Sequence, residues 1–236
     1  MDASRVLAPG QGETIRPGFE IKVGRPELVV TEAIYAPGDT GPDPHVHHDH
    51  VDSFFVLEGE LEWQVGPGLE PHRGGPGAFV LVPRDVLHSF RNPGPEPARF
   101  LNIHAPGLGF ERYLRGDFPE FDQHYLPAGS GLPPDGLIVL GPGESERLAE
   151  VEQLAASVAA IDGDSQRPPE GRLPERLESF YVLDGELRLI VEGEESAIPA
   201  DGFASVAPGS LRALAAPRGP VRFLHLLAPV FRHNML

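Results

Sequence analysis

One short stretch of this chain concentrates side chains that can bind a metal ion. Residues 45–59 read HVHHDHVDSFFVLEG, and the first half of this stretch holds four histidines and two aspartates. His45 and His47 are two residues apart, so on an extended strand both imidazoles point to the same face. Asp52 opens the apolar strand that follows, which places its carboxylate near the pair. Imidazole nitrogens and a carboxylate oxygen suit a divalent transition metal.

A second stretch supplies a third imidazole. Residues 77–92 read GAFVLVPRDVLHSFRN, which predicts a strand, a turn led by Pro83, and a second strand that opens on His88. Strand parity puts His88 on the same face as Phe90 and Asn92. Three imidazoles and one carboxylate would hold Fe, Mn, Ni, Co, Cu or Zn. We expect one divalent transition metal per chain.

The roles of Asp52, His50 and His104 leave alternatives open. Asp52 is interpreted as the fourth ligand, but it could instead accept a hydrogen bond from a ligand imidazole, which would leave a three-histidine site. His50 is interpreted as an exposed turn residue, with metal ligation or proton transfer as alternatives. His104 ends a later strand and is interpreted as a rim residue. If the site is catalytic, His50 and His104 are the candidate bases. His48 is expected to point to solvent.

Short strands separated by turns must position these side chains. Glycine and proline number 28 and 27, a composition typical of many strands joined by turns. Apolar pieces in residues 5–25 indicate edge strands. The main strands are expected at 27–35, 53–57, 61–65, 78–82, 86–91 and 98–104. Helical patterns are limited to residues 110–115 and 119–124, so the sequence predicts an antiparallel sandwich or barrel of the jelly-roll kind.

The residue types and spacing of the two stretches resemble the two motifs of the cupin superfamily. The matching positions are His45, His47, Asp52 and Gly59 in the first motif, and Gly77, Pro83, His88 and Asn92 in the second. The family usually has glutamate where this chain has Asp52, and glycine where it has Asp85. The resemblance implies a double-stranded β-helix barrel with a bound metal.

The second half of the chain repeats the first. Residues 53–61 (SFFVLEGEL) recur as 179–187 (SFYVLDGEL), and residues 77–83 recur as 202–208. We therefore expect an all-β protein with two tandem cupin jelly-roll barrels and a short helical linker segment. The expected domains are residues 1–130 and 131–236, and residues 126–136, rich in Gly, Pro and Ser, are interpreted as the linker.

The second copy lacks the histidines of the first. The residues matching His45, His47 and His88 are Gly171, Leu173 and Ala213. Glu178 keeps the Asp52 position, and beside Arg172 and Arg176 it is interpreted as an ion-pair partner. A metal is therefore expected in the first barrel only.

A bicupin with one metal site resembles the quercetin dioxygenase and pirin-like branch of the superfamily. The resemblance implies a metal-dependent dioxygenase that acts on small oxygenated substrates such as enediols, catechols, flavonols or oxo acids. A lyase, isomerase or decarboxylase that uses the metal as a Lewis acid is an alternative. A binding protein without catalysis is another.

The overall charge and composition exclude several kinds of partner. A net charge of −16 argues against nucleic acid and anionic membranes. The chain has no cysteine, and therefore no disulfide or thiolate ligand. It has no run of membrane-spanning length and no signal-peptide core near Met1, so a cytoplasmic location is expected. Pairing of sheet edges into a homodimer is a further hypothesis.

Overall fold

The structure is a computed structural model that describes residues 4–163, 171–173 and 175–230. These residues group into two compact units. The first unit comprises residues 13–145, and the second comprises residues 1–12 and 146–236. The predicted division was at residues 130 and 131. In the structure, the segment up to residue 145 groups with the first unit and the first 12 residues with the second.

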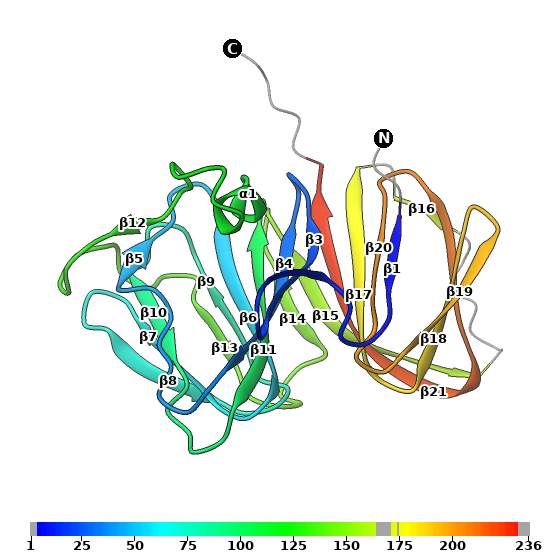
Figure 1. Cartoon of the computed structure of the whole chain (residues 1–236), viewed down its shortest axis with the longest axis horizontal. Coiled ribbons are helices and arrows are strands. Elements are labelled where there is room, and N and C mark those ends of the chain that lie inside the picture. The colour runs from blue at the N-terminus through cyan, green and yellow to red at the C-terminus, as the bar shows by residue number, and fades with distance from the viewer. Residues whose placement is uncertain (1–3, 164–170, 174, 231–236) are drawn as a thin grey trace, which may run out of the picture. The chain divides into compact units, whose positions relative to one another are not determined.

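Two antiparallel sheets form the first unit (Figure 1). One has the order β13-β9-β6-β11-β4-β3-β2, with bounds Ile138–Leu140, Phe79–Val82, Val51–Glu58, Ala98–Ala105, Val29–Tyr35, Phe19–Gly24 and Glu13–Arg16. The other has the order β12-β5-β10-β7-β8, with bounds His124–Tyr125, His45–Val46, His88–Arg91, Leu61–Val65 and Glu70–Gly74. The strands expected from the sequence are present, and β8 was not anticipated.

The core of the first unit lies between these sheets. Phe54 and Phe100 come from the larger sheet and Trp63 and Phe90 from the smaller, and all four are buried in one cluster. Phe54 packs on Phe90 with ring centroids 4.8 Å apart. Each strand therefore turns one row of side chains inward, as the alternating pattern predicts.

The second unit repeats this architecture. Its strands are β1 (Arg5–Leu7), β14 (Arg147–Glu150), β15 (Ala155–Gly163), β16 (Gly171–Arg172), β17 (Arg176–Asp184), β18 (Glu186–Val191), β19 (Glu194–Pro199), β20 (Phe203–Val206) and β21 (Leu211–Pro229). The order in the main sheet is β1-β20-β17-β21-β15-β14, and β21 also pairs with β16 and β18. The prediction of an all-β chain with two jelly-roll barrels is confirmed.

Equivalent turns in the two units depend on glycine for the same reason. Gly59 has φ +72°, and a Cβ there would lie 2.4 Å from the carbonyl oxygen of Pro97. Gly185 has φ +81°, and its Cβ would lie 2.4 Å from the oxygen of Pro220. Only glycine avoids both the left-handed strain and the clash. Asp85, where the family usually has glycine, keeps the left-handed conformation with φ 63°.

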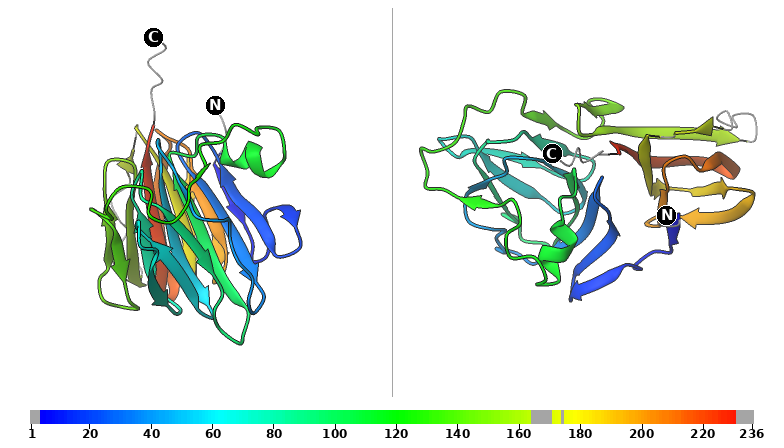
Figure 2. Two further views of the ribbon diagram at one scale, coloured as in Figure 1. Left: turned by 90° about the vertical axis from the view of Figure 1, so that its left-hand side faces the viewer. Right: turned by 90° about the horizontal axis from the view of Figure 1, so that it is seen from above.

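Two expectations for the region after β11 need correction. The helix near residues 110–115 is confirmed as α1 (Phe110–Leu114), but residues 119–124 form no helix. They run as an irregular segment into β12, which pairs with β5. Residues 126–136 are not a free linker, because the backbone N–H groups of Leu126 and Gly129 donate to the carbonyl oxygens of Pro44 and Pro67. Seen from above, α1 and this segment lie across one end of the first unit (Figure 2).

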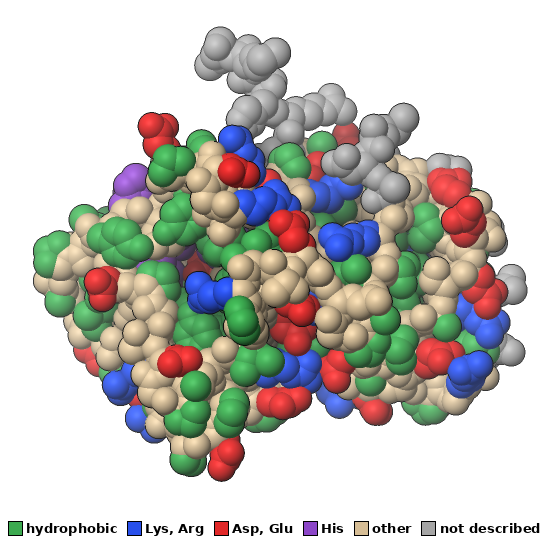
Figure 3. Space-filling model, in the orientation of Figure 1, with side chains coloured by type: hydrophobic (Ala, Val, Ile, Leu, Met, Phe, Trp, Pro, Cys, Tyr) green, Lys and Arg blue, Asp and Glu red, His purple; other side chains and the backbone are tan. Residues whose placement is uncertain are grey.

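Positive and negative side chains are intermixed on the surface. Acidic and basic side chains alternate over the face drawn in Figure 3, and histidine side chains are visible at its left. No helix among the described residues is long and apolar enough to cross a membrane.

Candidate metal centre

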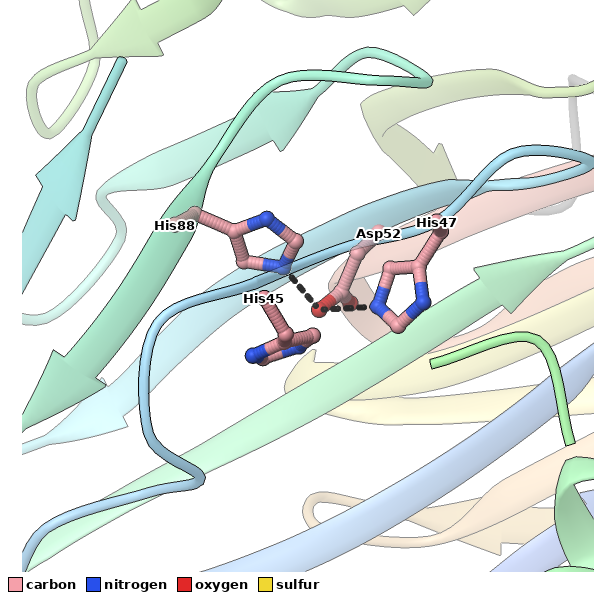
Figure 4. Close-up of side chains that lie close together, drawn as sticks. All are labelled: His45, His47, Asp52 and His88. Carbon is pink, nitrogen blue, oxygen red and sulfur yellow. Dashed lines mark hydrogen bonds and ion pairs between the residues drawn. The ribbon is translucent and has the colours of Figure 1, made fainter. Parts of the chain in front are cut away.

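Four buried side chains from three strands and one loop converge in the first unit. His45 on β5 lies directly opposite His88 on β10. His47 follows β5, and Asp52 points inward from β6. One potential ligand atom from each of the four lies within 4.8 Å of the others, and each residue is at most 2% exposed (Figure 4). The motif spacing therefore brings together all four residues predicted as metal ligands.

Backbone carbonyl groups set the orientation of the three imidazoles. The Nδ1–H of His45 donates to the carbonyl of Asp43 (2.8 Å), that of His88 to Val86 (3.0 Å), and that of His47 to Asp122. A neutral imidazole that donates from Nδ1 presents a lone pair at Nε2. All three rings thus turn an unprotonated nitrogen toward the same point, as metal-bound histidines do.

The distances around Asp52 test whether an ion would fit. Its Oδ2 lies 3.3 Å from His88 Nε2 and 3.8 Å from His47 Nε2. Donors at about 2.1 Å from an ion in tetrahedral or octahedral geometry are separated by about 3.0–3.4 Å, so small shifts would bring both pairs into range. His47 Nε2 is buried and has no hydrogen-bond partner among the described residues. A cation would satisfy this nitrogen and the facing lone pairs, so the donor set fits a divalent transition metal.

Asp52 is held in place as a carboxylate. Its Oδ1 accepts a hydrogen bond from Asn102 Nδ2, which leaves Oδ2 facing the imidazoles. Burial acts to raise the pKa of Asp52, but the neighbouring imidazoles outweigh burial and hold the pKa well below its ordinary value. Burial, with the nearby His88 and His47 rings, lowers the pKa of His45 to about 2. His45 and His47, whose pKa values are both lowered, therefore present neutral nitrogens beside one anionic oxygen.

A second group of histidines lies behind the first. His50 donates from Nδ1 to Asp122 Oδ2 (3.0 Å), His50 Nε2 lies 2.9 Å from His104 Nδ1, and His104 Nε2 lies 2.9 Å from Asn102 Oδ1. The contacts at both ends face oxygen acceptors, so His50 donates from Nδ1 and His104 donates from Nε2. One proton placed between the two facing nitrogens would complete a hydrogen-bonded chain from Asp122 to Asn102. Burial lowers the pKa of His104 well below its ordinary value.

The burial of this pair corrects two sequence interpretations. His50 was expected to be an exposed turn residue, but it is fully buried. His104 was expected at the barrel rim, but it is 3% exposed and stacks on Phe110 with centroids 3.8 Å apart. His48 is exposed, as predicted, and pairs with Asp85. The signal for burial was the apolar cluster in residues 110–121, which covers these rings.

Asp122 is the main functional residue that sequence reasoning missed. Its carboxylate accepts hydrogen bonds from the backbone N–H groups of His48 (2.9 Å) and Asp49 (2.8 Å) and from the His50 ring. Its carbonyl oxygen accepts from His47. Burial would raise the pKa of Asp122, but these hydrogen bonds hold it well below its ordinary value. One residue thus fixes the whole loop between β5 and β6, although no motif marks it.

A cavity of about 270 Å³ adjoins the candidate metal ligands. His45, Asp52, Asn102 and His104 line it together with aromatic side chains. His50 does not line the cavity and contacts it only through His104. A small organic molecule in this space could reach both the candidate metal ligands and His104.

The second unit fills the equivalent position with an ion pair. In the first unit, His88 lies opposite Val65 and His45; in the second, Arg212 lies opposite Val191 and Gly171. Since residues 61–65 match 187–191, the residue equivalent to His88 is Arg212. The sequence alignment, which gave Ala213, was wrong by one residue, because the turn after Pro208 is one residue shorter than the turn after Pro83.

Glu178 occupies the position of Asp52 and pairs with this arginine. Its oxygens lie 2.7 and 3.1 Å from Arg212 Nε and Nη2, and 2.7 Å from His225 Nε2. Burial would raise the pKa of Glu178, but hydrogen bonds from His225 and Arg212 hold it below its ordinary value. The predicted ion pair is present with different partners, and the Arg172 side chain is outside the described residues. All described groups of three or more candidate metal donors lie in the first unit.

The lowered pKa values of the buried histidines predict acid sensitivity of the metal-free protein. The pKa values of His45, His47 and His104 all lie below that of a free imidazole, with burial as the largest cause. Between the unfolded pKa near 6.5 and these lowered values, the unfolded chain binds more protons, so stability falls as pH falls. We expect a loss of about 1.4 kcal/mol per pH unit for each ring that stays neutral.

Urea unfolding of chelator-treated protein at pH 7.5, 6.5 and 5.5 would measure this loss. A free energy of unfolding that is flat or rises between pH 6.5 and 5.5 would contradict the assignment of neutral buried rings.

Comparisons with known proteins agree with this fold. The two barrels define a protein of the jelly-roll class, and the first barrel carries a histidine–aspartate group placed for metal binding. Residues 31–104, which contain all four candidate ligands, match the cupin domain family. The matched residues lie within the first unit, and the fold of that unit agrees with the match.

Individual relatives share only low sequence identity with this chain. The chain is 27% identical over 130 residues to quercetin 2,3-dioxygenase of Bacillus subtilis, a match that covers 52% of this chain and 37% of that protein. A putative glyoxylate-induced protein of Pseudomonas aeruginosa superposes with a TM-score of 0.71 at 18% identity, covering 100% of this chain and 91% of the other. A variant of oxalate decarboxylase from Bacillus subtilis gives 0.60 at 13% identity, covering 98% and 78%. These structural likenesses concern the fold.

Proposed function

We propose that the first unit is the active site of a metal-dependent dioxygenase that acts on a small oxygenated substrate. One observation carries the proposal: three Nε2 atoms and Asp52 Oδ2 converge beside a cavity large enough for an organic molecule. His45, His47, Asp52 and His88 would hold one divalent metal, with Fe, Mn, Ni, Cu, Co and Zn as candidates. When bound, this ion would supply Lewis-acid activation of substrate oxygens and a binding position for dioxygen.

The surrounding residues have separate tasks in this proposal. His104 lines the cavity and is the residue that would take a proton from a substrate hydroxyl or return it. His50, held by Asp122, would exchange a proton with His104 on the side away from the cavity. It would not contact the substrate. Asn102 orients Asp52 and His104 through its two ends. Phe110 and Phe121 stack over the histidines and keep bulk water from them.

The similarity to a quercetin dioxygenase supports oxygen chemistry, whereas the cavity size limits the substrate. A volume of about 270 Å³ is just under the range of about 300–1,000 Å³ typical of drug-sized ligands. A single-ring diol or hydroxy acid is therefore a better candidate than a flavonol. A non-redox lyase, isomerase or decarboxylase is the second candidate, because His104 beside the cavity, hydrogen-bonded to His50, could move a proton to or from a substrate carbon without oxygen.

Anaerobic reconstitution separates these candidates. The chelator-treated protein would be loaded in turn with each of the six metals, and its metal content, oxygen uptake and product formation measured with catechols, flavonols and small oxo acids. Oxygen uptake with Fe, Mn, Ni or Cu is the expected result. Turnover without oxygen, with Zn as well as Fe, would favour the non-redox candidate. Stoichiometric metal without turnover of any substrate would favour a binding protein and count against both enzymes.

A further inference from the structure

The cavity beside the metal centre contains one cationic side chain that the proposed chemistry does not use. Among the described residues that line it, Arg16 is the only lysine or arginine. Arg16 also lines an adjoining cavity of about 280 Å³, which it shares with Phe19, Tyr35 and Thr40 and which includes none of the candidate metal ligands. Arg16 therefore lies on the side of the inner cavity away from the imidazoles.

The guanidinium of Arg16 is positioned but not neutralised. Its central carbon lies 4.7 Å from the centre of the Phe19 ring, so a cation–π contact holds its plane. No ion pair to Arg16 is found within the described parts of the chain. The acidic side chain that lines the outer cavity is Asp39, and its Oδ2 accepts a hydrogen bond from the Ala36 N–H. The N–H groups of Arg16 are thus available to an anion.

A phenol stands beside this guanidinium. Tyr35 lines both cavities, and its ring is fixed between Phe90 (centroids 5.7 Å apart) and Phe100 (5.1 Å). Within the described residues its hydroxyl makes no hydrogen bond. Burial raises the pKa of Tyr35, so the group remains an O–H donor at neutral pH. Arg16 and Tyr35 together offer charged and neutral donors to one acceptor group.

The remaining wall favours a flat molecule. Phe19, Phe90, Phe110 and Tyr113 all face the inner cavity. We propose that the substrate is a planar, single-ring carboxylate whose acid group binds Arg16 and Tyr35 while its hydroxyl oxygens face His45 and Asp52. Arginine binds a carboxylate through two parallel hydrogen bonds, which makes Arg16 the residue that selects an acid over a neutral analogue. This proposal rests on the proposed function of the site.

Binding of two matched ligands tests the proposal without relying on turnover. The probes are 3,4-dihydroxybenzoate and the neutral 3,4-dihydroxybenzamide, titrated calorimetrically into metal-loaded and chelator-treated protein. We expect the acid to bind at least about tenfold more tightly than the amide, the range of a charge-assisted hydrogen bond. The R16M variant should lose this preference while it keeps its metal content.

Arg112 provides a matched control. Its guanidinium also lies over an aromatic ring, that of Phe118 at 5.0 Å, but it does not line the cavity. R112M should therefore keep the preference for the acid. Equal binding of acid and amide by the wild type, or an unchanged preference in R16M, would overturn the role of Arg16.

The experiments distinguish failure of the proposed function from failure of the carboxylate site. A chain that binds and turns over the neutral diol without preferring the acid keeps the proposed function and loses the carboxylate site. A chain that binds no metal but prefers the acid in an Arg16-dependent manner keeps the carboxylate site and loses the proposed function.

Discussion

Replacing His47 with alanine is expected to abolish stoichiometric metal binding. The variant removes a buried nitrogen that has no hydrogen-bond partner in the described structure. Loss of one of four donors should lower metal affinity by at least about 100-fold, since loss of an outer-shell partner alone costs tenfold to 100-fold. Elemental analysis and competition with a chromogenic chelator would measure the loss.

His48 is the natural control, because it is the neighbouring residue in the sequence and differs only in its direction. Its side chain is half exposed and pairs with Asp85. His48→Ala should bind metal as the wild type does. Equal affinity in both variants, with circular dichroism showing both folded, would mean that the convergent imidazoles are not a metal site.

The Arg212→Met variant is expected to destabilise the second unit by about 3–5 kcal/mol, the cost of leaving a buried charge without its partner. Glu178 is 1% exposed and would keep His225 as its partner. Methionine preserves most of the volume, so the effect would report charge rather than packing. Chemical unfolding followed at several wavelengths would measure it.

The double variant Arg212→Met, Glu178→Met provides the internal control. With both charges replaced by apolar side chains, most of the lost stability should return, as it does when buried ion pairs are replaced whole. If the single variant is as stable as the wild type, the pair does not compensate the buried carboxylate.

The sequence was informative where function depends on nearby residues of a regular strand. Alternation on strands correctly placed Asp52 inside the barrel, and the spacing of His45, His47 and His88 brought their rings together. Strand positions need only the local pattern and the turn residues, which this chain shows clearly. The assignment of these residues as ligands, and of His50 and His104 as catalytic, stays a prediction for the variants above.

The errors arose where distant segments decide the local structure. Residues 119–124 have a helical pattern, but Asp122 instead caps the loop after β5, and β12 pairs with that strand. His50 is a polar turn residue by sequence, but the rings of His47, His104 and Phe121 pack against it and bury it. Arg212 was missed because a single-residue slip in a weak repeat changes which side chain faces inward. Homodimerisation and cellular location also remain predictions.

The pairing of β1 with β20 has a consequence for synthesis of the protein. The first unit is continuous in the chain, so it can fold as soon as residue 145 has left the ribosome. Strand β1 emerges before the first unit, yet its partner, residues 203–206, is translated only after that unit. Until then β1 is an unpaired edge available to other nascent chains. Its short length, from Arg5 to Leu7, limits that exposure.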